Sequence, residues 1–130
     1  MFIGYHLVTS FFATIATKVT NEHNKMKKID TKCSLTMALK VIGGKWKPII
    51  IARLGKSSKR FGQLDAAIIG VSRKVLTSHL NELVNDKLVN RTSFREIPPR
   101  VEYSLTDKGR ELLPILKEIG KWGQYLVKEE

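Results

Sequence analysis

From residue 34 onward, apolar side chains recur with the period of α-helices, and glycines separate the successive segments. The first predicted helix covers residues 34–42, with Ser34 as its cap and Gly43–Gly44 as its stop, because glycine readily adopts the positive φ of a helix end. A second helix opens at Lys45–Pro48, where a proline in the first turn costs no hydrogen bond. It stops at Gly55 and is apolar on nearly all sides, so we expect it at the centre of the core.

The next segments predict two helices joined by a turn. Lys56–Arg60 is polar and basic and is predicted to be a loop, and a short amphipathic helix follows from Phe61 to near Gly70. Ser72 is a good cap for a longer helix that runs to about Lys87. One side of that helix is predicted to be buried, and it carries Val75, Leu76, His79, Leu80, Leu83 and Val84. His79 is expected to be a core residue whose hydrogen bonds are satisfied.

The opposite side of the same helix carries short polar and basic groups, and no acidic residue occurs before Glu82. Hydroxyl, amide and cationic groups without an acid suit contact with phosphates and base edges in a DNA major groove. An ordinary solvated face more often includes glutamate, and the helix alone leaves both interpretations open. The candidate DNA-contacting residues of this helix are Arg73, Lys74, Thr77, Ser78 and Asn81.

Two predicted strands, Val89–Ile97 and Arg100–Leu105, follow the polar-faced helix, and Pro98–Pro99 at their join interrupts the ladder. A β-ribbon after a helix-turn-helix is a wing. Phosphate contacts from a wing fix the register of a helix that reads the groove. The ribbon therefore favours the DNA-binding interpretation, with three further candidate contacts: Arg91, Arg95 and Arg100.

Thr106 can cap a last helix from Asp107 to about Lys128, which Pro114 should kink or divide. This helix offers more apolar surface than one small domain easily covers. The surplus predicts a seam between two copies of the chain, although packing within one copy is the alternative. The predicted dimerisation residues are Leu112, Leu116, Ile119, Trp122 and Leu126.

Composition narrows the class of protein. The 130 residues are 42% hydrophobic and 27% charged, which is the balance of a globular domain rather than of a disordered chain. A single cysteine excludes an internal disulfide and favours a reducing compartment. The 23 Lys and Arg residues outnumber the 12 Asp and Glu residues, and the net charge of +11 points to a polyanionic partner such as nucleic acid.

Residues 1–25 differ in kind from the rest. The segment 1–17 has no charged residue, yet hydroxyl side chains interrupt it, no basic residue precedes it, and it is short for a membrane span. We interpret 1–25 as an N-terminal extension, either weakly structured or upstream of an effective start at Met26, and 26–130 as the domain. The positive charge belongs to that domain, and no membrane partner is expected.

Four motifs, taken in order, resemble the HxlR-type winged helix-turn-helix transcriptional regulators: Ile42–Lys47, Phe61–Leu64, Ile69–Thr77 and Pro98–Gly109. The resemblance runs from about Cys33 to Gly109 and is expected to continue to the end of the chain. It implies a mainly α fold with a small β-hairpin, a winged helix-turn-helix domain and terminal dimerisation helices. It further implies a cytoplasmic bacterial homodimer that binds duplex DNA at a palindromic operator, with the Ser72 helix reading the DNA and the Pro98–Pro99 hairpin as the wing.

Cys33 is a candidate sensor of oxidants or small-molecule electrophiles. Many members of the family have a cysteine just before the first helix, and some use it to sense such reagents, although Ser34 here replaces their usual proline. Neighbouring lysines and a helix N-terminus would favour the reactive thiolate. A small buried apolar side chain is the alternative role, and both remain open.

Other chemistry is sparse. The three histidines, His6, His23 and His79, have no metal-ligand spacing, and Gly43–Gly44–Lys45 lacks the pattern of a phosphate-binding loop. We therefore expect no metal, no cofactor and no enzymatic activity. Two alternatives to a DNA-binding regulator are an RNA-binding or ribosome-associated basic protein, which should expose stacking aromatics, and a thiol enzyme centred on Cys33, which needs a nearby histidine.

Overall fold

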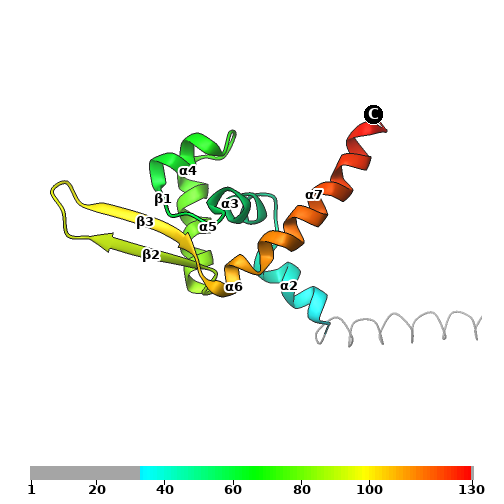
Figure 1. Cartoon of the computed structure of the whole chain (residues 1–130), viewed down its shortest axis with the longest axis horizontal. Coiled ribbons are helices and arrows are strands. Elements are labelled where there is room, and N and C mark those ends of the chain that lie inside the picture. The colour runs from blue at the N-terminus through cyan, green and yellow to red at the C-terminus, as the bar shows by residue number, and fades with distance from the viewer. Residues whose placement is uncertain (1–32, 130) are drawn as a thin grey trace, which may run out of the picture. The chain divides into compact units, whose positions relative to one another are not determined.

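The computed structural model describes residues 33–129, so the predicted extension 1–25 and the lysines before Cys33 lie outside the described residues (Figure 1). The chain divides into two units, Met1–Val41 and Ile42–Glu130. The described part of the first unit is Cys33 and helix α2 (Ser34–Ile42), whose last residue, Ile42, begins the second unit. The carbonyl of Cys33 accepts the first helical hydrogen bond from the N–H of Met37 at 3.1 Å. Cys33, and not Ser34 as predicted, therefore takes the cap position.

The second unit is mainly helical with a small antiparallel sheet, which confirms the predicted fold class. The sheet has three strands in the order β1-β3-β2. The elements of the second unit are, in order, α3 (Trp46–Leu54), β1 (Lys59–Arg60), α4 (Phe61–Ala67), α5 (Arg73–Asn85), β2 (Val89–Phe94), β3 (Arg100–Leu105), α6 (Asp107–Arg110) and α7 (Leu112–Lys128).

Helix α3 lies at the centre of this unit, as its all-round apolar pattern predicts. It contacts α4, α5, α7 and β3. Burying one aliphatic side chain of this kind contributes about 1.5–3 kcal/mol, so this shared core holds the helix-turn-helix to the sheet. The largest fully buried side chains are Ile50, Ile51, Leu54, Leu64, Leu76, Leu80, Leu83 and Leu105.

The sheet corrects two predictions. The segment Lys56–Arg60 is not entirely a loop, because Lys59 and Arg60 form strand β1 and pair with Tyr103 and Glu102 of β3. Strand β2 ends at Phe94 instead of Ile97. Its continuation turns back at once, since the N–H of Glu96 bonds to the carbonyl of Phe94 at 3.0 Å. Residues 95–99 therefore form the tip of the hairpin rather than a strand.

The C-terminal helix is divided, as predicted from Pro114. Helix α6 ends at Arg110, Glu111 separates it from α7, and Pro114 lies in the first turn of α7. Proline has no N–H to donate to the carbonyl four residues earlier, so an uninterrupted helix loses a bond here. Figure 1 shows α7 leaving the body of this unit as an arm, while the β2–β3 hairpin projects on another side.

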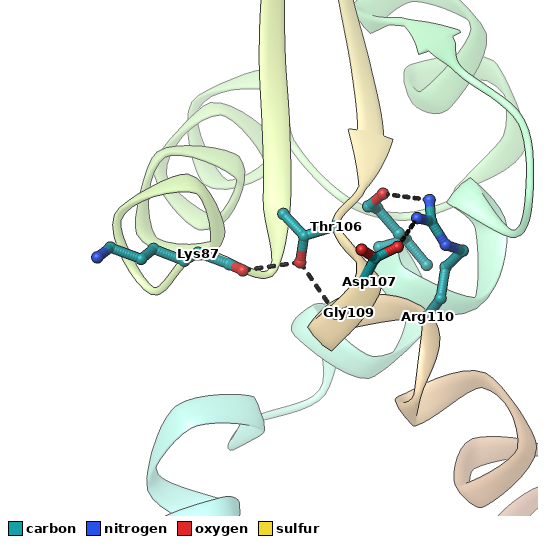
Figure 2. Close-up of polar contacts among 6 residues, drawn as sticks. Lys87, Thr106, Asp107, Gly109 and Arg110 are labelled. Atoms are coloured by element: carbon teal, nitrogen blue, oxygen red, sulfur yellow. Dashed lines mark hydrogen bonds and ion pairs between the residues drawn. The ribbon is translucent and has the colours of Figure 1, made fainter.

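A compact set of hydrogen bonds, which we call the Thr106 joint, ties α6 to the end of α5 and the start of β2 (Figure 2). The hydroxyl of Thr106 donates to the carbonyl of Lys87 at 2.8 Å and accepts from the N–H of Gly109 at 3.0 Å. The N–H of Thr106 donates to the carbonyl of Leu88 at 3.0 Å. Arg110 donates to the carbonyl of Leu105 at 2.8 Å and pairs with Asp107. Thr106 is thus the cap that the sequence predicts.

Candidate nucleic-acid interface

Helix α5 has the orientation that the sequence predicts. The hydroxyl of Ser72 accepts a hydrogen bond from the N–H of Val75 at 3.2 Å and caps the helix. Leu76, Leu80 and Leu83 are fully buried against the core. The five candidate DNA-contacting side chains of this helix are all exposed: Arg73, Lys74, Thr77, Ser78 and Asn81. Because no acidic residue of α5 precedes Glu82, the first half of the helix presents a polar surface without carboxylates.

Two of these side chains are positioned by contacts that the sequence did not reveal. Arg73 Nε donates to Asp65 Oδ2 of α4 at 2.9 Å, and the Arg73 side chain stays 80% exposed. The exposed Thr77 hydroxyl donates to the Arg73 carbonyl at 2.8 Å, so its oxygen keeps lone pairs that can accept a hydrogen bond. Arg73 is therefore held across the turn between the two helices, while Lys74 makes no ion pair within residues 33–129.

The three arginines of the hairpin differ in exposure and in their contacts. Arg91 on β2 and Arg95 at the tip are exposed. Arg100 is half-buried: it pairs with Glu96 at 3.2 Å and Glu102 at 3.7 Å, and its guanidinium lies 4.1 Å from the centre of the Phe94 ring. The charge of Arg100 therefore faces two carboxylates and an aromatic ring, and this cluster fixes the shape of the hairpin near its tip.

An ion pair between helices α3 and α5 went unpredicted. Lys47 is buried, and its Nζ lies 2.6 Å from Glu82 Oε2. The hydrogen bond and the charge of Lys47, with a smaller effect of His79, lower the pKa of Glu82 below its ordinary value. His79 is half-buried, and its Nδ1 lies 3.8 Å from the same carboxylate without a hydrogen-bond partner among residues 33–129, so the prediction of a satisfied core histidine is wrong. The pair spans 35 residues of sequence, and no local pattern marks it.

This ion pair predicts a pH dependence of stability. The Glu82 carboxylate binds a proton less readily in the folded chain, so its stabilising effect is complete above the ordinary pKa of 4.5 and is lost as pH falls through the lower folded value. In Lys47→Met this part of the acid sensitivity should disappear. Urea unfolding at pH values on either side of 4.5 measures the effect, with the exposed Lys56→Met as control. Equal acid sensitivity in the wild type and Lys47→Met contradicts the expectation.

Helix α7 keeps an apolar face open. No residue of α7 is buried within the described part of the chain. Among the predicted dimerisation residues, Ile119, Trp122 and Leu126 are 51%, 63% and 52% exposed, and Leu112 and Leu116 are half-buried. We call these five residues the α7 face. No helix within residues 33–129 is long and apolar enough to cross a membrane.

Comparison with known proteins places this geometry in a family. The sequence matches the family described as HxlR-like helix-turn-helix over residues 41–130. An uncharacterized HTH-type transcriptional regulator of Halalkalibacterium halodurans is 48% identical over 101 residues, which cover 76% of this chain and 88% of that protein.

Solved structures give the same result. The oxidized form of the redox regulator HypR is 39% identical with a TM-score of 0.67, over 72% of this chain and 96% of that one. The reduced form of the transcriptional regulator YodB from B. subtilis is 33% identical with a TM-score of 0.62, over 69% of this chain and 89% of that one. The chain belongs to the HxlR-like helix-turn-helix family of transcriptional regulators, and its β2–β3 hairpin is the wing of a winged-helix fold.

Proposed function

We propose that this regulator binds duplex DNA sequence-specifically as a homodimer, with α5 in the major groove and the wing on the flanking backbone. The observation that carries the proposal is the exposed first half of α5, which combines cations, hydroxyls and an amide without an acid. Such a surface donates to phosphates and base edges together. The net charge of +11 adds the long-range attraction that DNA binding requires.

Each contact residue has a distinct role in this proposal. Lys74, and Arg73 beside it, contact phosphates, and Thr77, Ser78 and Asn81 contact base edges. Arg91 and Arg95 contact the backbone from the wing, because their side chains are exposed. Arg100 holds the shape of the wing and does not itself contact DNA, since its guanidinium is engaged with Glu96, Glu102 and the Phe94 ring.

We propose that the α7 face forms the interface of the homodimer. Three of its five side chains are more than half exposed, and an exposed apolar face on a helical arm gains most by pairing with the same face of a second copy. A two-fold dimer presents two α5 helices, which suits a palindromic operator with half-sites one helical turn apart. Such a regulator works in the cytoplasm, where bacterial DNA lies.

Two substitutions on α5 separate the proposed phosphate contacts from the base contacts. Lys74→Ala should weaken binding to every duplex and reduce the slope of affinity against salt by about one, since one phosphate contact is lost. Asn81→Ala should instead reduce discrimination between the selected operator and its base-pair variants by roughly 1–3 kcal/mol. Fluorescence anisotropy at several salt concentrations, with operators selected from random duplexes, measures both effects.

The matched control is Lys128→Ala, which removes an exposed cation at the far end of α7. Identical behaviour of the Lys74 and Asn81 variants contradicts the proposed orientation of α5. Tighter binding to single-stranded RNA than to any duplex contradicts the function itself and favours an RNA-binding protein.

We also propose that Cys33 responds to electrophiles or oxidants. Cys33 is half-buried at the N-terminus of α2, where the helix dipole favours a thiolate. The redox regulator HypR and YodB, whose structure is also known after diamide treatment, are related proteins. The thiolate sulfur would add to a carbon of a quinone, whose oxygen then takes up a proton. Quinone treatment should change operator affinity in the wild type and not in Cys33→Ser, and an equal response in both contradicts the proposal.

A further inference from the structure

A hollow of about 220 Å³ lies between α3 and the end of α4, apart from the proposed DNA-contacting face of α5. Trp46, Ile49 and Ile68 line its apolar part, and Ile69 stands at its edge with 92% of its surface exposed. Lys45 and Arg53 complete the lining. None of the described residues that line the hollow is acidic, so an apolar wall and two cations face the same small space.

The spacing along α3 explains how the cations bracket the apolar wall. Lys45, Ile49 and Arg53 are four residues apart and therefore lie in one row, with the two cations about 12 Å apart at a rise of about 1.5 Å per residue. Lys45 Nζ is engaged with Trp46, at 4.7 Å from the ring centre. Arg53 makes no ion pair, hydrogen bond or ring contact within residues 33–129. Its planar guanidinium is thus available to a carboxylate, which it can bind through two hydrogen bonds.

The volume of the hollow suits a small occupant. An apolar cavity of about 150 Å³ holds a benzene ring, so a hollow of about 220 Å³ has room for one ring and a carboxylate. We propose that this hollow is a binding site for a small organic monoanion, an aromatic carboxylate of the size of benzoate. Arg53 binds its carboxylate, Ile49, Ile68 and Ile69 cover its ring, and Lys45 raises the local positive potential.

The hollow lies next to the turn between α4 and α5. Gly70 directly follows the lining residue Ile69 and has a φ of +91°, and a Cβ built there would lie 3.6 Å from Trp46 Cη2. The wall of the site is therefore in contact with the turn that leads into Ser72 and α5.

Binding is testable without DNA, so the result is independent of the proposed function. In the full-length ¹⁵N-labelled chain, the indole N–H signals of Trp46 and Trp122 are the two tryptophan reporters. Titration with sodium benzoate should move the Trp46 signal to saturation and leave the Trp122 signal in place. Arg53→Gln should weaken binding about tenfold or more, as expected for the loss of a charge-assisted hydrogen bond. The exposed Lys117→Gln is the control of equal charge change.

Two further probes separate the parts of the site. Benzamide keeps the ring without the charge, and acetate keeps the charge without the ring, and both should bind at least tenfold more weakly than benzoate. The proposal is overturned by a linear response of both indoles, by undiminished binding in Arg53→Gln, or by acetate binding as tightly as benzoate. Since Arg53 is exposed, the variant should keep the wild-type spectrum, which the same experiment checks.

Discussion

Gly109→Ala is expected to destabilise the chain by about 3 kcal/mol, the upper part of the usual range for an overpacked core site. A Cβ added at Gly109 would overlap the carbonyl oxygen of Leu88 and lie 3.1 Å from its carbonyl carbon and 3.3 Å from Leu105 Cδ2. The Leu88 carbonyl also accepts the N–H of Thr106, so it cannot move without breaking the Thr106 joint. The cost therefore comes from sterics against backbone.

Urea unfolding followed by circular dichroism measures this loss at constant protein concentration. Gly62→Ala is the matched control, because a Cβ at that helical position meets nothing within 4 Å. It should be neutral or stabilising by up to about 1 kcal/mol, since alanine favours helix over glycine. A Gly109 variant as stable as the Gly62 variant would show that α6 does not pack on Leu88 as described.

Ile119→Glu should weaken the proposed homodimer more than a hundredfold. In a two-fold seam each substitution occurs twice, and it buries an unpaired carboxylate where an apolar side chain stood. A central contact of this kind contributes about 2 kcal/mol or more, and 1.4 kcal/mol is tenfold in affinity. Sedimentation velocity measures the dimer, and binding to an operator with both half-sites should fall toward the affinity for a single half-site.

Gln124→Glu provides the control, because it adds the same charge on the opposite side of α7 and is exposed. It should leave both the dimer and operator binding unchanged. If Ile119→Glu also remains a dimer, the α7 face is not the seam, whereas DNA binding by α5 would stand.

The sequence predicts the elements whose signal is local. Leu76, Leu80 and Leu83 repeat with a helical period after the cap at Ser72, so the buried side of α5 and its exposed polar side both follow from spacing. Pro114 breaks the last helix for a reason that proline itself supplies. The sequence alone therefore predicts the division between α6 and α7.

The parts that depend on distant partners could not be predicted in the same way. Strand β1 has two residues and exists because β3, more than forty residues later, provides its ladder. The Lys47–Glu82 pair is another long-range contact. Arg100 looked equivalent to Arg91 and Arg95 in sequence, and only the register of the hairpin brings Phe94 opposite to it. Composition shows how many cations there are, and packing decides which remain available.

The Thr106 joint has a consequence for the operator. The carbonyls of Lys87 and Leu88, just after α5, are bonded to Thr106, and Gly109 of α6 bonds to the same hydroxyl. A single residue, Glu111, separates the end of α6 from the start of α7, so no flexible linker lies between the α7 arm and the proposed DNA-contacting helix. In the proposed dimer the two α5 helices are therefore held at a fixed distance and orientation. One inserted base pair shifts a half-site by about 3.4 Å and turns it by roughly a tenth of a helical turn, a change this rigid span cannot follow.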